Sequence, residues 1–439
     1  MPNTDASPRG SPVSKPEHRS GFDGVLQGLS NPLTPIFLVV FIDLVGVGIA
    51  LPILAPLFLD PVHGLLTGSE SLELRTLLMG VLIASYSFAQ FLGAPILGGL
   101  SDRFGRKKML LLSLAGTLAG YVIFGLGILA HNLALLFAGR LIDGITGGNI
   151  SIALSAIADV SEPRAKARNF GLIGMAFGLG FIIGPYIGGL LSNPAVLPWF
   201  DYATPFWFAA GLVALNMAMM QVQFRETLRT RTRVKIDPWM GFRNVRKALS
   251  LPALRAIFIT SFLFVFGFSL YNQFLQVFLF EKFRFGAADI GNFFAYIGVC
   301  VALVQGLLTG PVSALSPSAR TLRWTLAGAA VALGLLILPP SSWMLYLLIP
   351  PLSVFVGLTF PNLNSVISGL GGGESQGELL GLNQSVQALA MAIPPLLAGF
   401  AVAWGVDVPI LLAGLFTGLG WGVFVLFFKE RAAPKFHEV

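Results

Sequence analysis

Charged residues are scarce in this 439-residue sequence: only 11% are Asp, Glu, Lys or Arg, against about 25% in soluble domains. A soluble chain of this length would form two or three domains, and their surfaces would need far more charge than is present. The composition therefore excludes a water-soluble enzyme. It also excludes a nucleic-acid-binding protein, because the net charge of +7 comes from Lys and Arg that lie between apolar segments.

Cysteine and histidine are scarce as well. The single cysteine, Cys300, excludes a disulfide framework and a cysteine-based metal cluster, and the four histidines lie too far apart to be metal ligands. We therefore expect no metal and no cofactor. The chain has no G-x-x-x-x-G-K-[ST] loop, which excludes ATP as the energy source, and no nucleophile–base set that would indicate an enzyme.

Hydrophobic residues, by contrast, make up 55% of the chain. About 20 consecutive apolar residues cross a bilayer as a helix, and the runs here lack the polar–apolar alternation of membrane β-strands. We expect an all-α membrane protein with twelve transmembrane helices in two pseudo-symmetric six-helix bundles. The expected spans are 34–59, 75–100, 108–129, 133–158, 167–191, 203–224, 252–280, 289–312, 321–338, 342–368, 378–400 and 406–428.

The longest connection between spans divides the chain into two sets of six. We expect a disordered tail at 1–30, which lacks the apolar core and cleavage site of a signal peptide. The other expected units are an N-terminal bundle at 31–224, a basic linker at 225–251, a C-terminal bundle at 252–428 and a second tail at 429–439.

Lys and Arg give the orientation of the chain. If the N-terminus is cytoplasmic, all but four of the 28 Lys and Arg lie on the cytoplasmic side: Arg75, Lys282 and Arg284 lie outside, and Arg140 lies within a span. The positive-inside rule therefore predicts a cell-membrane protein with both termini in the cytoplasm.

The linker contains a short amphipathic pattern. The segment Trp239–Ser250 places Phe242, Val245 and Leu249 at helical spacing, beside basic residues. This pattern predicts a helix on the cytoplasmic membrane surface; a solvated basic loop is the alternative.

The two halves look like weak repeats of each other. When the first and seventh spans are aligned, Ile, Phe, Phe and Gly recur in register and Asp43 aligns with Phe264. A glycine precedes Pro185 by fourteen residues, and another precedes Pro395 by the same interval. A parallel repeat of six helices is one plan of secondary transporters.

Three charged residues lie within the expected spans, where a charge costs about 2.5–3.5 kcal/mol on insertion scales. Asp43, in the first span, is either a structural acid with a permanent hydrogen bond or a functional acid that gains and loses a proton as a cavity opens. Arg140 and Asp143 share one face of the fourth helix. They form either a fixed ion pair or a pair that switches partners.

Uncharged polar side chains also occur within the spans, mainly in the second half. Amides often join transmembrane helices by hydrogen bonds, so each one is either such a link or part of a substrate cavity. The cavity candidates are Asn149, Tyr271, Asn272, Gln273, Gln276, Gln305, Asn362, Asn383 and Gln387.

The loop after the second span reads G-G-L-S-D-R-F-G-R-K-K from Gly98 to Lys108. Its first glycine and Gly105 permit close packing and a sharp turn, and Asp102 can lie at a helix N-terminus. The loop resembles the signature G-x-x-x-D-R-x-G-R-[RK] of the major facilitator superfamily. A positive-inside loop with no further role is the alternative.

The fifth span reads G-L-G-F-I-I-G-P-Y-I-G-G. Gly180, Gly184 and Gly188 recur every four residues and form one groove for close helix contact, and Pro185 kinks the helix. With Gly189, the string is similar to the G-P-x-x-G-G antiporter motif of exporters in the same family.

Together with Arg140 and Gly144 in the fourth span, these motifs make the N-terminal half resemble the drug/proton antiporters, near the tetracycline/proton antiporters. The resemblance implies that Asp43, Arg140 and Asp143 couple transport to protons and that a charged cluster holds the cytoplasmic gate. The gating candidates are Gly98, Asp102, Arg103, Gly105, Arg106 and Asp159.

The sequence also departs from that family pattern. The eighth span lacks the membrane histidine that tetracycline transporters share, which puts tetracycline in doubt as a substrate. The second copy of the loop signature, at 310–320, lacks its acid, and Asp143 stands where many relatives have an amide.

The resemblance implies a secondary exporter that releases a small organic compound, apolar or cationic, as a proton enters. A proton-coupled importer on the same fold is the alternative, because a fold does not fix function. We expect a monomer driven by a proton gradient. Its partners would be a small-molecule substrate, protons and membrane lipid, without nucleic acid.

Overall fold

The structure is a computed structural model that describes residues 33–62, 64–66, 70–160, 166–228, 237, 239–252, 254–370 and 372–428. All regular secondary structure in these residues is helical. The tails expected at 1–30 and 429–439 lie outside the described residues.

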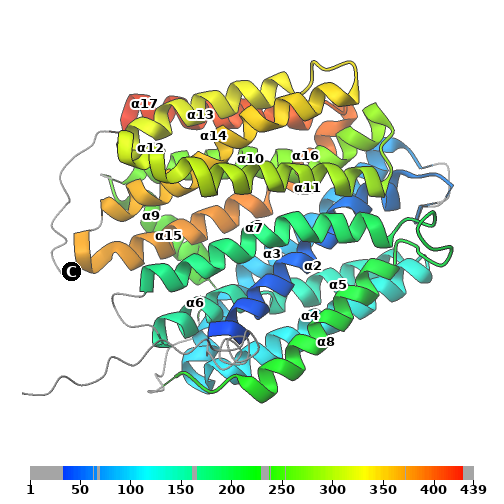
Figure 1. The fold of residues 1–439 in the computed structure, drawn as a ribbon, viewed down its shortest axis with the longest axis horizontal. Helices are drawn as coiled ribbons and strands as arrows, with labels where there is room; N and C mark the ends of the chain where they lie inside the picture. The colour runs from blue at the N-terminus through cyan, green and yellow to red at the C-terminus, as the bar shows by residue number, and fades with distance from the viewer. Residues whose placement is uncertain are drawn as a thin grey trace, which may run out of the picture.

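The first bundle contains seven helices, which form the lower part of Figure 1. Helix α7 packs along α2, and α4 packs against α5 and α8. The helices are α2 (Leu33–Leu59), α3 (Leu72–Phe104), α4 (Arg106–Leu129), α5 (Leu133–Thr146), α6 (Asn149–Val160), α7 (Lys166–Leu191) and α8 (Thr204–Gln223).

The second bundle forms the upper part of Figure 1 and follows the linker helix α9 (Met240–Ser250). Its core packs α10 against α17 and α13 against α14. Its elements are α10 (Arg255–Phe283), α11 (Ala287–Leu303), the π-helical turn η1 (Val304–Leu308), α12 (Thr309–Leu315), α13 (Ser318–Leu335), α14 (Ser342–Gly369), α15 (Gly372–Ala392), α16 (Pro394–Ala401), the 3-10 turn η2 (Val402–Trp404) and α17 (Val408–Phe427).

The expected fold class is confirmed. Ten helical segments of the described chain are long and apolar enough to cross a bilayer, and α7 adds the shorter apolar stretch Gly178–Leu191. The remaining span is α13, a helix of 18 residues that carries Arg320 and Arg323 in its first turns. The protein is an all-α membrane protein built from two six-helix bundles.

Three of the twelve spans are interrupted, which the apolar runs did not predict. The fourth breaks between α5 and α6 at Gly147 and Gly148, the eighth contains η1, and the eleventh breaks at Ile393, before Pro394. Proline lacks the N–H that would continue a helix. A membrane interior tolerates such breaks only where other groups bond to the freed backbone atoms.

Helix α3 of the first bundle packs against α16 of the second through backbone atoms. A Cβ at Gly80 would collide with the carbonyl oxygen of Pro395 and would lie 3.2 Å from the Cα of Gly399. The hydroxyl of Thr76 donates a hydrogen bond to the carbonyl oxygen of Gly399 at 3.2 Å. Because there is no room for a side chain at position 80, this close contact requires glycine.

The contact between α7 and α11 repeats this arrangement. A Cβ at Gly291 would lie 2.5 Å from the carbonyl oxygen of Pro185 and 3.1 Å from the Cα of Gly189. Each contact therefore places a Pro-x-x-x-Gly segment of one bundle against a glycine of the other. This equivalence supports the internal repeat in which Pro185 aligns with Pro395.

Both contacts lie away from the loop Arg103–Lys108. We call the side of that loop the basic side and the other end of the helices the opposite side. A buried hydrogen bond from the backbone N–H of Ala55 to Oε1 of Gln276, at 2.9 Å, also joins the bundles toward the opposite side. The bundles are therefore packed together at that end.

On the basic side, α9 lies between α3 and α15. The ring of Phe242 packs edge-to-face on Phe91 of α3, with 4.9 Å between the centroids. The amide Nδ2 of Asn244 donates to the hydroxyl of Ser385 in α15 at 3.0 Å. A helix thus forms where the amphipathic pattern predicted one, but Phe242 and Val245 pack against the protein and the helix contacts both bundles. Its position on the membrane surface stays a prediction.

Replacing a contact glycine should prevent closure of the opposite side. Overpacking by the new side chain in Gly80→Val or Gly291→Val costs about 1–3 kcal/mol, so the closed state should be disfavoured roughly 5–150-fold. Gly211→Val is the matched control, because a Cβ there meets nothing within 4 Å. A cysteine placed at Gln273, in a Cys300→Ser background, reports closure through its labelling by an impermeant reagent added on the opposite side. Equal labelling of all three valine variants would contradict this role.

Candidate functional site

Three charged side chains are buried together inside the first bundle, and we call them the charge cluster. Asp43 in α2 and Asp143 in α5 are each 3% exposed, and Arg140 in α5 is 6% exposed. Asp143 lies within electrostatic range of both Asp43 and Arg140, at a depth where burying a charge is expensive. No group of three His, Cys, Asp or Glu side chains in the described part of the chain is placed to hold a metal ion.

Close helix packing holds both acids in place. The hydroxyl of Tyr121 in α4 lies over Gly46, one turn after Asp43, where a Cβ would collide with it. Asp143 is pressed against α4 as well, because a Cβ at Gly120 would lie 2.7 Å from the Cβ of Asp143. Glycines in α2 and α4 therefore bring the three helices close enough for the acids to interact.

Aromatic rings hold Arg140. Its guanidinium carbon lies 4.8 Å from the ring centroid of Phe124 and 5.6 Å from that of Tyr86. A desolvated cation–π contact is worth about 2 kcal/mol. Arg140 and Asp143 do not form one of the ion pairs found among the described residues, so the fixed pair that the sequence left open is absent from this structure.

The break in the fourth span lies beside the charge cluster. Asn149 begins α6, and its amide faces the carboxyl group of Asp43. The Nε2 of Gln90 donates to the carbonyl oxygen of Gly147 at 2.9 Å, and the hydroxyl of Ser113 donates to the carbonyl oxygen of Thr146. Side chains thus bond to the carbonyl groups at the break, as the membrane interior requires.

Four polar residues around the charge cluster were not predicted from the sequence. Tyr86 and Gln90 lie four residues apart on α3, and Thr117 and Tyr121 lie four apart on α4. Thr117 faces Asp143, and both tyrosines lie within electrostatic range of the two acids. Polar pairs at this spacing share one helix face, so their position in apolar spans could have identified them.

Several of the amides proposed for a substrate cavity instead join helices of the second bundle. The hydroxyl of Ser261 in α10 donates to Oδ1 of Asn383 in α15 at 2.6 Å, and Asn383 donates to Asn364 in α14 at 3.1 Å. Gln387 donates to Ser261 at 3.5 Å, and Asn362 donates to a carbonyl oxygen of its own helix. Asn383 and Gln387 thus make the helix-joining bonds that the sequence left as the alternative, whereas the bond from Asn362 stays within α14.

Other candidates keep polar atoms that no described residue satisfies. The hydroxyl of Tyr271 and Oε1 of Gln273 are buried without a hydrogen-bond partner among the described residues. Buried polar atoms are normally hydrogen-bonded, so these two are available to a ligand. Asn272 is half-buried beside them on α10, and Gln305 is exposed on η1.

An aromatic cluster lies next to Tyr271 in the second bundle. The Phe360 ring packs edge-to-face on Phe264, with 5.0 Å between centroids, and on Phe268, with 5.3 Å. Phe268 in turn lies 6.1 Å from the ring of Tyr271. Since Phe264 aligns with Asp43 in the internal repeat, equivalent positions carry an aromatic cluster in one bundle and the charge cluster in the other.

The glycines of the fifth span make the close contact that their spacing predicted. Cβ atoms at Gly180, Gly184 and Gly188 would come within 2.7 Å of atoms of α2. Gly189 and the carbonyl oxygen of Pro185 face α11 instead, while the Pro185 ring lies against Gly48 of α2. The motif therefore serves packing within the first bundle and contact between the bundles.

On the basic side, Arg106 at the start of α4 joins two acids. Its Nη1 lies 2.6 Å from Oδ1 of Asp102, and its Nε lies 3.1 Å from Oδ2 of Asp159. The guanidinium of the exposed Arg103 lies 5.1 Å from the ring centroid of Phe104. The structure thus brings together three of the gating candidates that the sequence placed in one charged cluster.

Gly105 connects α3 and α4 with φ of 106° and ψ of 150°, a conformation that side chains rarely adopt. A Cβ there would also collide with the carboxylate of Glu226. That carboxylate accepts hydrogen bonds from the backbone N–H groups of Arg106, at 2.9 Å, and Lys107, at 3.2 Å, and so caps α4. Sequence reasoning missed Glu226 because 120 residues separate it from Arg106.

Comparison with known proteins agrees with this architecture. The profile of the Major Facilitator Superfamily matches residues 36–394 and, again, 257–438. The tetracycline resistance protein, class C, of Escherichia coli is 31% identical over 399 residues, which cover 89% of this chain and 93% of that protein. Multidrug resistance protein 2 of Bacillus subtilis (strain 168) is 27% identical over 89% of this chain and 94% of its own length. Among solved structures, the human organic anion transporter MFSD10 (TETRAN) superposes with a TM-score of 0.66 and 26% identity, over 89% of this chain and 98% of that one.

Substitution of Gly105 should destabilise the α3–α4 connection in two separable ways. Gly105→Ala should cost about 1–3 kcal/mol through backbone strain, with a further cost from the clash with Glu226. A second Glu226→Ala change should relieve the clash but not the strain, so the double mutant cycle should show coupling. Thermal unfolding of the purified protein measures both, with Gly99→Ala as the control, because a Cβ there meets nothing within 4 Å. If Gly105→Ala is as stable as the control, the prediction is wrong.

Proposed function

The chain belongs to the Major Facilitator Superfamily, and on this premise we propose that it is a proton-coupled exporter of small organic compounds that works by alternating access. Its fold and relatives are those of multi-pass membrane transporters and not of enzymes. The relatives named for tetracycline and multidrug resistance support export. The observation that carries proton coupling is the charge cluster.

The charge cluster contains two carboxyl groups and one guanidinium, and this imbalance favours proton exchange. Arginine stays protonated, so Arg140 can balance one carboxylate. An uncompensated second charge is costly to bury. The other carboxyl group is therefore most stable when protonated, and Asp43 and Asp143, both 3% exposed, exchange one proton as a pair.

Alternating access would turn this exchange into transport. In the state open to the cytoplasm, a compound that approaches the charge cluster favours release of the proton. In the state open to the outside, a proton entering the cluster favours release of the compound. Competition for the same pair of acids thus links the two movements without any covalent step.

The second bundle offers a surface for an apolar or cationic organic compound. The aromatic cluster of Phe264, Phe268 and Phe360 supplies ring faces, and rings suit both apolar and cationic groups. The hydroxyl of Tyr271 and Oε1 of Gln273 supply a hydrogen-bond donor or acceptor. The compound would lie between these groups and the acids of the first bundle.

The orientation follows from charge. We place the basic side in the cytoplasm, because Lys and Arg favour that side of a membrane. The bundles are packed together on the opposite side through Gly80 and Gly291. The structure then corresponds to the inward-facing state, from which an exporter takes up its substrate.

Removing either acid should abolish coupling. In Asp43→Asn or Asp143→Asn, Arg140 balances the remaining carboxylate and no proton is exchanged, so proton-driven transport should fall to background while substrate still binds the purified protein. Glu281→Gln, a change of an acid outside the charge cluster, should keep transport. The measurement is drug accumulation in inverted vesicles with an imposed pH gradient. Wild-type rates in either Asn variant would rule out the coupling role, and accumulation in right-side-out vesicles alone would indicate an importer.

Substitutions of two residues should shift the equilibrium between the open and closed states of the basic side in opposite directions. Helix α9 must move before α3 and α15 can meet there, so Phe242→Ala should favour closure. Asp102 would contact the positive N-terminal end of α15 once the helices meet, so Asp102→Asn should favour opening. Cysteines placed at Gly98 or Gly381 in a Cys300→Ser background report the state, because a Cβ at either glycine meets no atom closer than 3.6 Å. Labelling rates from the basic side that change in the same direction in both variants would contradict this assignment.

A further inference from the structure

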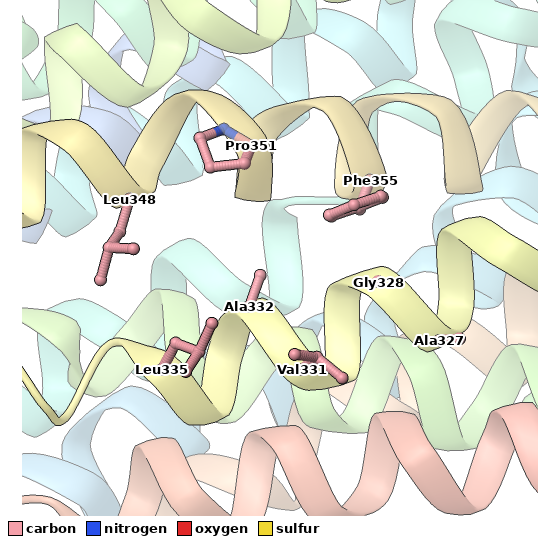
Figure 2. A pocket seen from close by; sticks show the side chains of 8 residues that line it. All are labelled: Ala327, Gly328, Val331, Ala332, Leu335, Leu348, Pro351 and Phe355. Atoms are coloured by element: carbon pink, nitrogen blue, oxygen red, sulfur yellow. The ribbon is translucent and has the colours of Figure 1, made fainter.

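An apolar groove of about 310 Å³ runs between α13 and α14 on the outer face of the second bundle. Figure 2 shows the residues of the two helices facing each other across it. Every side chain that lines it is apolar. They include Ala327, Val331 and Leu335 of α13, and Leu348, Pro351 and Phe355 of α14.

The groove faces outward from the bundle. Val331 is 62% exposed, Leu335 40%, and Leu338, just beyond α13, 67%. In a membrane protein, large apolar side chains exposed on a spanning helix contact lipid chains. The helix rises about 12 Å from Ala327 to Leu335, which is most of the ~15 Å of hydrocarbon in one leaflet.

Small residues and one aromatic pair shape the groove. A Cβ at Gly328 would collide with the ring of Phe355, so α14 lies close to α13 at this level. Trp324, one turn toward the basic side, packs edge-to-face on Phe355 with 6.2 Å between centroids. Trp324 is 39% exposed, and tryptophan favours the interface between lipid chains and headgroups.

Two arginines lie on the same face of α13, nearer the basic side. Arg320, Trp324, Gly328, Val331 and Leu335 follow one another at spacings of three or four residues, which places them along one helix face. Arg320 and its neighbour Arg323 are exposed. Neither takes part in an ion pair with another described residue. Guanidinium groups bind phosphate through two parallel hydrogen bonds.

We propose that this face is a binding site for one anionic glycerophospholipid of the leaflet on the basic side. Its phosphate lies against Arg320 and Arg323, Trp324 lies at the level of the glycerol backbone, and an acyl chain fills the groove along Val331. The occupant is a lipid because one molecule must offer an anionic group and, within about 12 Å, an extended apolar chain. The site does not depend on the transport proposed above, and its test needs no transport assay.

The test measures lipid retention by the purified full-length chain with native mass spectrometry. Phosphatidylglycerol is compared with phosphatidylcholine of the same acyl chains, and thermal unfolding with each added lipid is the second readout. Arg320→Gln with Arg323→Gln removes the phosphate contacts. Val331→Trp fills the groove and keeps both arginines.

Matched controls distinguish lipid binding at this site from a general attraction of anionic lipid to the basic side. Arg225→Gln with Arg246→Gln removes two exposed positive charges elsewhere on the basic side. Leu415→Trp adds the same bulk at another outward-facing position, which is 56% exposed. Wild type and both controls should prefer phosphatidylglycerol, and each site variant should lose about tenfold in its retention.

Four results would overturn the proposal. If the charge control loses as much phosphatidylglycerol as the arginine pair variant, surface potential explains the binding. If Val331→Trp retains the lipid fully, the groove is not the acyl site. If inorganic phosphate alone stabilises the protein as well as phosphatidylglycerol does, the arginines bind free phosphate. If Val331→Trp converts a dimer into a monomer, the groove is an interface between copies of this chain.

Discussion

The shortage of positive charge beside Asp43 and Asp143 constrains much of the first bundle. Arg140 is the one cation of the charge cluster, and the rings of Phe124 and Tyr86 hold its guanidinium. Water could stabilise both carboxylates, but the bundle interior cannot. Polar side chains from α3, α4 and α6 therefore surround the acids. The second bundle has no such need at the equivalent position, where Phe264 packs among aromatic rings. The two halves thus differ at these aligned positions, where one carries buried charges and the other carries aromatic rings.

The break in the fourth span is related to the same shortage of positive charge beside the buried acids. An unbroken fourth span would keep its backbone groups bonded within the helix and would leave no turn beside Asp43. The glycine pair before Asn149 allows that turn, and Gln90 bonds to a carbonyl group at the break. In transporters, discontinuous helices commonly form the binding site near the middle of the membrane. The break therefore supports the location of the site independently of the buried charges.

Two features of the sequence made part of this structure predictable, namely the length of its apolar runs and the rare charged residues within them. The spans followed from run length, and Asp43, Arg140 and Asp143 stood out because charges in apolar runs are costly. A close helix contact along α7 followed from glycines spaced by four, although the sequence did not identify α2 as the partner. Contacts between distant segments did not follow: Glu226 caps α4 from 120 residues away, and Gln276 bonds to the backbone of the first helix. Nor could the sequence decide which amides join helices, because that depends on which neighbour each amide meets.

The contacts that join the bundles on the opposite side have a consequence for how this protein senses its surroundings. Where Gly80 meets Pro395 and Gly291 meets Pro185, the nearest atoms across the contact are backbone atoms. These backbone contacts themselves hold no charge that a change of pH could alter or that ionic strength could screen. The nearby ion pairs of Arg75 with Glu70 and of Lys282 with Asp407 do hold such charges. In this architecture, the two glycine contacts depend on close packing and not on the acidity of the medium.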